Sequence, residues 1–241
     1  MKLAPSLRRI GNDIIAAYLV EDASGVTLVD AGVSGHWQEL LDELKAMGRT
    51  LADVRALLIT HGDTDHIGFA ERLRREANIP VYVHQADAAR ARGEDKPKAS
   101  WGKFKVGAVL RFMWYAGRHG GLRTTYLTEL RGLAGGETLD VPGSPQVLSL
   151  PGHSPGSVGY YFPSVDAVIV GDALTTGPHV LTGEVGPRLA PFTDDPAQAL
   201  ASLDQIESTG AKWVLVGHGI AWDQGATEAV RLVRQAAVAA A

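Results

Sequence analysis

Four short apolar segments of this chain each lead directly into a histidine or aspartate, and this recurrence constrains the fold more than any other feature. The segments are residues 56–60, 148–150, 168–170 and 214–216, and each has the length and composition of a buried β-strand. In open α/β sheets, functional groups gather where the strands end. The pattern therefore predicts an α/β fold in which four strand ends bring their polar residues to one place.

The polar residues at these strand ends are all able to bind metal ions. The first segment runs into the motif His61-x-Asp63-x-Asp65-His66, and the other three lead through a glycine to His153, Asp172 and His218. One such histidine alone is explained equally well as a ligand or as a turn residue, but three such segments in series with the motif favour ligands. The chain has no cysteine, so any metal must be held by imidazole and carboxylate groups.

Length, composition and charge narrow the class of protein. The chain has 241 residues, 45% of them hydrophobic, and a formal net charge of −4. We expect a single domain over residues 1–241 and no nucleic-acid partner bound through a generally basic surface. No apolar run approaches the roughly 18 residues of a membrane span, and no secretory signal opens the sequence. These features predict a cytoplasmic enzyme acting on a small molecule, and they leave the oligomeric state open.

Other apolar patterns predict the elements around the four segments. Ile14–Leu19 and Val26–Asp30 predict a β-hairpin, because a turn rich in Asp, Ser and Gly separates them. Apolar residues at helical spacing predict helices at Trp37–Met47, Ile67–Ala77 and Gly225–Ala237. The order suggests a layered α/β domain of two comparable halves, with sheets inside and helices outside.

Residues 86–135, here called the basic insert, interrupt this order. Between Arg90 and Arg131 there are ten Lys or Arg and three Asp or Glu, and apolar spacing predicts an amphipathic helix at Trp101–Ala116. The insert has three interpretations: a solvated basic face, a lid attracting an anionic or acyl-bearing substrate, or a contact with a membrane surface. The candidate substrate-binding residues are Trp101, Phe104 and Phe112 in the insert and His179 after Asp172.

The order of these residues along the chain resembles the metallo-β-lactamase superfamily, with a match extending from Leu28-Val29-Asp30-Ala31-Gly32 to His218. The resemblance implies a four-layer αβ/βα sandwich with a helical insert and two divalent metal ions at one edge of two sheets. It implies that one ion is held by His61, Asp63 and His153, the other by Asp65, His66 and His218, and that Asp172 bridges them. Asp30 is implied to be a structural residue near the site.

Asp63 departs from that pattern, because the superfamily usually has histidine at this position. A carboxylate adds negative charge and a harder oxygen donor, which shifts the preference from zinc towards iron or manganese. Two roles are open to Asp63: direct ligation, which we expect, or orientation of a ligand histidine. Di-iron oxidoreductases of the superfamily carry an acidic residue here, but they usually bear a flavin-binding domain for which this chain has no room. Zinc is the leading expectation, with iron or manganese as alternatives.

Such a site predicts hydrolysis. Two cations about 3.5–4 Å apart lower the pKa of a shared water from 15.7 to about 7, and the bridging hydroxide attacks a carbonyl carbon or a phosphorus. Asp65 is the candidate catalytic residue, since its carboxylate can orient the hydroxide and pass its proton on. Ser154 and Ser157 are expected in turn and capping positions, so no serine nucleophile is required.

The resemblance narrows the substrate to an ester, lactone or thioester. The absence of cysteine excludes β-lactamases with a cysteine ligand. Glyoxalase II-like enzymes carry a C-terminal glutathione-binding region, whereas this sequence continues for 23 residues after His218. Size and ligand order resemble acyl-homoserine lactonases. The alternatives are a phosphodiesterase of the same fold, a di-iron oxidoreductase, and a non-catalytic metal-binding or membrane-associating module.

Overall fold

The computed structural model describes residues 1–96 and 104–240, so Trp101 lies outside the described residues. Within these ranges the chain forms two sheets and six α-helices. The helices are α1 (Trp37–Ala46), α2 (Ala70–Ala77), α3 (Ala88–Ala91), α4 (Val106–Arg118), α5 (Pro196–Ser208) and α6 (Ala226–Ala240). In the described part of the chain, no helix combines the length and apolar character needed to cross a bilayer.

The first sheet contains seven strands in chain order. They are β1 (Lys2–Ala4), β2 (Leu7–Gly11), β3 (Ala16–Asp22), β4 (Gly25–Val29), β5 (Val54–Leu58), β6 (Val81–His84) and β7 (Arg131–Leu133). Neighbours from β1 to β4 are antiparallel, and those from β4 to β7 are parallel. A tight turn fixes the β3–β4 register, because Asp22 pairs with Gly25 and Asp22 Oδ1 accepts the Ser24 N–H at 2.6 Å.

The second sheet has four strands in the order β11–β10–β9–β8. They are β8 (Gln146–Ser149), β9 (Val158–Phe162), β10 (Ala167–Gly171) and β11 (Trp213–Val216). The β8–β9 and β9–β10 pairs are antiparallel, and β10–β11 is parallel. All residues of β10 are buried, which explains its uninterrupted apolar sequence, since layers cover both of its faces.

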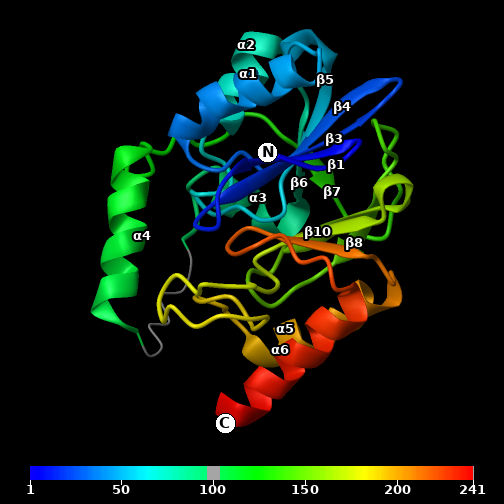
Figure 1. Cartoon of the computed structure of the whole chain (residues 1–241). Coiled ribbons are helices and arrows are strands. Elements are labelled where there is room, and N and C mark those ends of the chain that lie inside the picture. Colours follow the sequence, from blue (N-terminus) through cyan, green and yellow to red (C-terminus); the bar gives the residue numbers. More distant parts are fainter. Residues whose placement is uncertain (97–103, 241) are drawn as a thin grey trace.

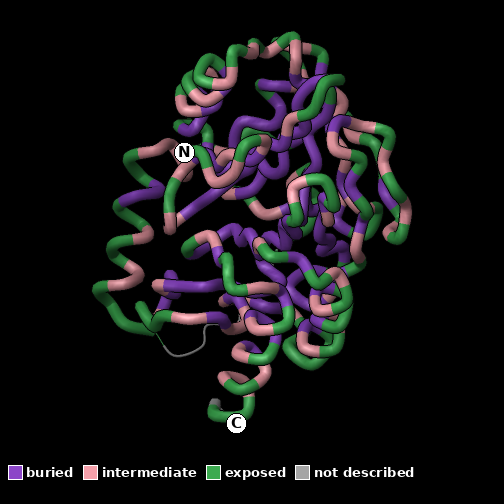
Figure 2. Tube along the Cα trace, turned by 45° about the vertical axis from the view of Figure 1, so that its right-hand side comes forward, coloured by how far each residue is buried: buried purple, intermediate pink, exposed green. Residues whose placement is uncertain are grey.

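The sheets face each other, and helices cover their outer faces (Figure 1). Tyr18 and Tyr160 belong to the apolar cluster between the sheets. A second cluster, which includes Leu40 and Leu73, joins the first sheet to α1 and α2. A third, which includes Leu203, joins the second sheet to α5 and α6. These layers form the expected four-layer αβ/βα sandwich, with burial concentrated along the strands (Figure 2).

Several element boundaries differ from the sequence-based expectation. The hairpin begins at Ala16, not Ile14, because the Ile14 N–H donates to Asn12 Oδ1 in a preceding turn. Helix α2 begins at Ala70 because the backbone N–H groups of His66 and of the next residue donate to the carbonyl oxygen of Asp63, closing a separate turn. The two halves are also unequal, since β1 and β2, which were not expected, extend the first sheet to seven strands.

Helix α4 lies beside the sandwich, outside its four layers (Figure 1). Its bounds are Val106–Arg118, two residues further along the chain at its C-terminal end than the helix expected at Trp101–Ala116. Lys105 is extended, with φ −106° and ψ 125°, so α4 begins after it; the first residues of the expected helix, 101–103, lie outside the described residues.

Candidate metal centre

Seven His and Asp side chains from four loops converge at one end of the two sheets. The loop between β5 and α2 supplies His61, Asp63, Asp65 and His66, and the loops after β8, β10 and β11 supply His153, Asp172 and His218. They form three overlapping groups whose ligand atoms lie within 4.8 Å of one another: His61, His66 and Asp172; His61, Asp63 and His153; and Asp65, His66 and His218. The last two groups are the two ligand sets implied by the resemblance.

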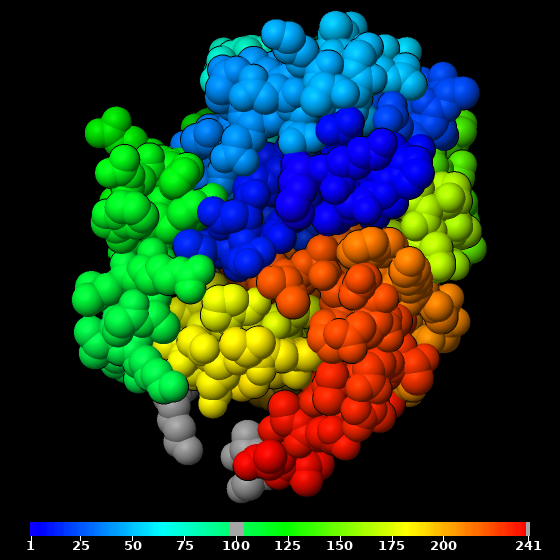
Figure 3. Space-filling model, viewed as in Figure 1, coloured from blue at the N-terminus to red at the C-terminus, as the bar shows by residue number. Residues whose placement is uncertain are grey.

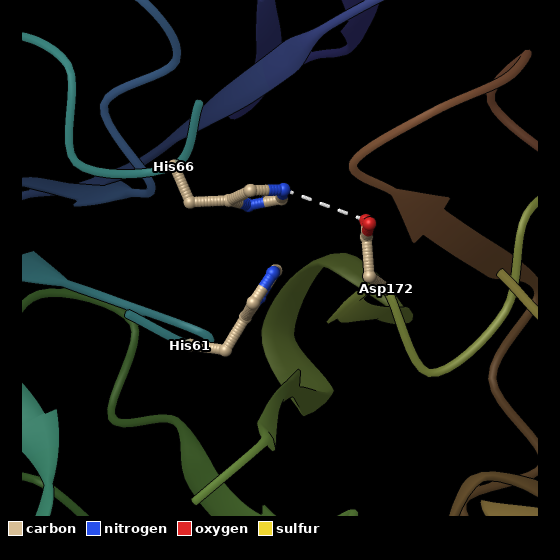
Figure 4. A group of neighbouring side chains, drawn as sticks. All are labelled: His61, His66 and Asp172. Carbon is tan, nitrogen blue, oxygen red and sulfur yellow. Dashed lines mark ion pairs between the residues drawn. The ribbon is translucent and has the colours of Figure 1, made fainter. Parts of the chain in front are cut away.

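The first group is arranged as if for a cation. His61 and His66 of the β5–α2 loop and Asp172 of the loop after β10 point towards a common centre (Figure 4). His66 Nε2 lies 3.4 Å from Asp172 Oδ1. Within the described residues, neither of these buried atoms nor His61 Nε2 has a hydrogen-bond partner. Because buried polar atoms without partners are rare, and imidazole and carboxylate are suitable donors, these residues fit a divalent metal ion.

Hydrogen bonds on the far side of three rings determine which nitrogen faces the centre. Nδ1 of His66 lies 2.8 Å from Asp30 Oδ2, and Nδ1 of His218 lies 2.5 Å from a backbone carbonyl oxygen of the β2–β3 loop. Nδ1 of His61 lies 3.1 Å from the Thr60 hydroxyl, whose own proton is donated to Asp30. Each Nδ1 therefore carries a proton, which leaves the lone pair of Nε2 directed at the centre.

Burial and mutual attraction set the charges of the site. Burial raises the pKa of Asp172, but the neighbouring His218 and His66 hold it well below its ordinary value. Burial lowers the pKa of His218, while Asp172 and Asp65 raise it to about 10. The carboxylates are therefore ionised at neutral pH, as metal ligands must be, and the proton that they hold on His218 Nε2 is the one that a bound metal ion would displace.

Asp87, which the sequence interpretation did not identify, joins two of the ligand loops. It is buried after β6, and its Oδ2 accepts the Gly62 N–H at 2.8 Å and the Ser154 hydroxyl at 2.7 Å. Its Oδ1 accepts the Gly156 N–H at 2.7 Å. Ser154 Oγ is thus directed at Asp87, and Ser157 Oγ accepts the Ser154 N–H, so both serines occupy turn positions.

Two glycines allow the strand ends to approach closely. A Cβ on Gly217 would lie 2.4 Å from Asp172 Oδ1 and 2.4 Å from a ring atom of His66. Gly171 has a φ of 52°, and a Cβ there would lie 2.3 Å from Thr60 Oγ1. Side chains at these positions would fill the space between the ligand loops.

Asp63 has an unexpected partner in Arg90. Asp63 Oδ2 faces His153 Nε2 at 3.3 Å and His61 Nε2 at 3.5 Å, whereas Oδ1 lies 2.7 Å from Arg90 Nε. Arg90 is only 4% exposed, and its Nη1 lies 3.7 Å from Asp194 Oδ2. Arg90 therefore does not contribute to the exposed charge of the basic insert. Nothing in the local sequence indicates that α3 turns this arginine inward.

A cavity of about 530 Å³ adjoins the centre. Its lining includes Ile14, Lys105, Arg111, Phe112, His179 and Val180. The Phe112 ring lies 6.1 Å from the ring of His218, and burial lowers the pKa of His179 to about 4. Two of the candidate substrate-binding residues thus line a cavity beside a candidate ligand. Phe104 is 54% exposed and does not line this cavity.

The fold and the His/Asp centre define a class of metal-binding hydrolases. The family profile of the Metallo-beta-lactamase superfamily matches residues 10–218, and the chain belongs to this superfamily.

Individual relatives agree with this assignment. The Bacillus subtilis (strain 168) protein named "Probable metallo-hydrolase YqgX" is 29% identical over 204 residues, covering 84% of each chain. A hydroxyacylglutathione hydrolase of Synechococcus sp. (strain JA-3-3Ab) is 30% identical over 192 residues, which are 78% of this chain and 57% of the relative. The crystal structure of TTHA1623 in a di-iron-bound form is 30% identical, with a TM-score of 0.62 and 93% of each chain covered. General metal-dependent hydrolysis follows from the family and these relatives.

Proposed function

We propose that the protein is a dinuclear metal-dependent hydrolase that cleaves an ester, lactone or thioester bond. The convergence of three overlapping ligand groups, whose Nε2 and carboxylate oxygens face one another, carries this proposal. When bound, two divalent cations supply an activated water and polarise the electrophile.

The two ligand sets share Asp172 in this proposal. Its Oδ2 lies 3.2 Å from His218 Nε2 and 3.9 Å from His153 Nε2, while its Oδ1 lies 3.4 Å from His66 Nε2. One carboxylate that faces histidines of both sets is suited to bridge two ions. Asp63 offers Oδ2 to the first set and is held at its other oxygen by Arg90, which supports direct, monodentate ligation.

Asp65 is the proposed catalytic residue. Its Oδ2 lies 3.3 Å from His218 Nε2. Burial raises the pKa of Asp65, but His218 lowers it below its ordinary value. Asp65 is therefore ionised near neutral pH, so it can orient a nucleophilic water and accept its proton.

The cavity supports a small acyl-bearing, anionic substrate. Phe112 and Val180 offer apolar contact to an acyl group, while Lys105 and Arg111 offer positive charge to an anionic group. The relative named hydroxyacylglutathione hydrolase makes a thioester the first substrate to test, with esters and lactones beside it.

The metal is proposed to be zinc, with iron or manganese as alternatives. Asp63 favours a harder ion than a third histidine would, and the similar TTHA1623 structure is in a di-iron-bound form. That form also keeps a di-iron redox protein as the second candidate. A single domain over residues 1–241, with residues 86–135 as an insert, and a cytoplasmic location stay predictions.

A reconstitution screen tests this function. Protein loaded separately with zinc, manganese and iron is assayed on thioesters, lactones, carboxylic esters and phosphodiesters, with metal content measured in each sample. We expect about two ions per chain and turnover of an acyl substrate. Turnover of phosphodiesters alone would assign the rival hydrolase. A coloured two-iron protein without hydrolysis would assign the redox candidate, and metal loading with neither property would assign a non-catalytic module.

A further inference from the structure

Helix α4 is apolar on its outward side as well as on its inward side. Val106, Leu110, Met113 and Trp114 are between 48% and 64% exposed, and helical spacing puts them on one face. Soluble proteins usually place polar residues on the outward face of a surface helix, and a helix that is hydrophobic all round is normally covered. The outer face of α4, defined by these four residues, therefore has the character of a contact surface.

The opposite face of α4 fixes how the helix is oriented. Tyr115 is buried with Ile15 and Val33 in a separate apolar cluster, and its hydroxyl lies 2.7 Å from His36 Nε2. The backbone N–H of Lys105 donates to a carbonyl oxygen of the loop after β10 at 2.8 Å. Because these contacts hold the inner face, the four exposed residues face away from the sandwich, and α4 itself projects at the side of the molecule (Figures 1 and 3).

The stretch of sequence that contains α4 carries positive charge only. Residues 96–128 include seven Lys or Arg and no Asp or Glu, whereas the rest of the chain has sixteen Lys or Arg and all twenty-seven Asp or Glu. Within the described ranges no carboxylate lies at ion-pair distance from Lys105, Arg111 or Arg118; Glu184, which pairs with Arg188, acts on Lys105 only at longer range. Arg118 instead lies over the ring of Trp114, at 5.1 Å from its centroid. Positive charge is thus concentrated beside exposed apolar residues on a protein that is negative elsewhere.

We propose that the outer face of α4 docks on an anionic lipid bilayer surface. A helix that presents apolar side chains flanked by Lys and Arg binds at a membrane interface through apolar burial and through attraction to anionic headgroups. A second copy of this chain is a poorer occupant, because pairing two such faces would bring like charges together.

Docking in this way has a geometric consequence. Arg111 and Phe112 of the same helix line the cavity beside His218. The bilayer would therefore lie next to the cavity. An acyl-bearing amphiphile could then pass directly from the bilayer into the cavity. The docking itself depends on neither the metal ions nor the proposed reaction.

Vesicle co-sedimentation of the full chain tests the proposal. Phosphatidylcholine vesicles are compared with phosphatidylcholine vesicles containing phosphatidylglycerol, at low and high salt. We expect binding to the anionic vesicles only, weakened by salt. The double variants Leu110→Gln/Trp114→Gln and Arg111→Glu/Arg118→Glu are each expected to weaken binding by about tenfold or more.

Val238→Gln is the matched control, because Val238 is an exposed apolar residue on a different helix, α6, and binding should be unchanged. Circular dichroism verifies the fold of each variant. Failure of the wild-type chain to bind anionic vesicles would overturn the proposal, as would binding that survives both double variants. Concentration-dependent dimerisation abolished by Leu110→Gln/Trp114→Gln would assign the face to a second copy instead.

Discussion

The metal centre buries charged groups, whereas α4 exposes apolar ones, so the two regions depart from the usual burial pattern in opposite directions. His66 and Asp172 are buried, while Leu110 and Trp114 are more than 60% exposed. In soluble proteins a buried polar group or an exposed apolar patch is more informative than the reverse. A mismatch between side chain and environment, of either sign, therefore marks a candidate functional region.

The two regions also differ in how they are attached. Asp30 and Asp87 tie the ligand loops together with buried hydrogen bonds. Helix α4 rests on the sandwich through the small cluster around Tyr115 and the His36 contact. We therefore expect changes in the centre to affect metal binding and stability strongly, and changes on α4 to act mainly on what it contacts.

The largest effect is expected for Asp172→Ala. Loss of both oxygens that face the histidines should reduce kcat/KM by about a thousandfold, or about 4 kcal/mol. Metal analysis should show the chain losing bound ions, while vesicle binding stays at the wild-type level. A variant that retained both ions and full turnover would remove Asp172 from the site, and a variant that lost vesicle binding would contradict the independence of the two regions.

Asp87→Ala is expected to have the next largest effect. It leaves the buried donors of Gly62, Ser154 and Gly156 without their acceptor, so the free energy of unfolding in urea should fall by about 3 kcal/mol. Asp223→Ala is the control, because Asp223 is exposed, and it should change stability by less than about 0.5 kcal/mol. Equal effects of the two changes would show that Asp87 does not hold the loops.

The Asp63–Arg90 pair tests how the unusual carboxylate is held. Arg90→Gln should weaken binding of one metal ion by about 10- to 100-fold, as loss of a group that orients a ligand typically does. Asp63→His alone would leave the buried Arg90 guanidinium beside an imidazole, so the double variant Asp63→His/Arg90→Gln should bind metal better than Asp63→His. Competition with a chromophoric chelator measures the metal affinity of the wild type, the two single variants and the double variant. Strictly additive effects would contradict the pairing.

The smallest effect is expected for the pH dependence of stability that His36 causes. It tests how α4 is attached to the sandwich, because His36 contacts Tyr115 of that helix. Burial lowers the pKa of His36 to about 4, although Glu39 opposes the shift, whereas an unfolded histidine titrates near 6.5. Between pH 6.5 and pH 4, His36 is protonated in the unfolded chain but still neutral in the folded one. The contribution of neutral, buried His36 to the free energy of unfolding is therefore complete above about pH 6.5 and is lost as the pH falls towards 4.

Between pH 8 and pH 5 the loss should be about 2 kcal/mol. Urea unfolding of the wild type and of His36→Gln at both pH values isolates the share of His36, since other groups titrate alike in the two proteins. Identical pH dependence in both would contradict this account of the contact.

The ligand loops could be predicted because their signal is local. A buried strand ending in Gly-Asp172 or Gly-His218 fixes both the position and the direction of the ligand, so seven side chains predicted from the sequence meet in the structure. That they bind metal stays a prediction. The layered α/β class followed for the same reason, because β5, β10 and β11 are short apolar runs with clear ends, whereas the four-layer arrangement was implied by the family resemblance.

Residues whose role depends on distant partners could not be predicted. Arg90 and Asp87 acquire theirs only when α3 and the turn before it pack against the loops. Strands β1 and β2 were missed because Arg9 interrupts the apolar pattern of β2. Arg9 is nevertheless buried, where it donates to Asp13 and to the carbonyl oxygen of Gly219, 210 positions away. No spacing rule contains such a contact.

The ligand groups draw on both halves of the sandwich: His66 follows a strand of the first sheet, and Asp172 and His218 follow strands of the second. An ion held between them would link the two sheets. Because it would bind only the folded chain, its binding would raise the free energy of unfolding by mass action. The thermal unfolding temperature would then rise with the concentration of free metal. Removal of the metal would therefore lower the stability of the whole domain as well as its activity.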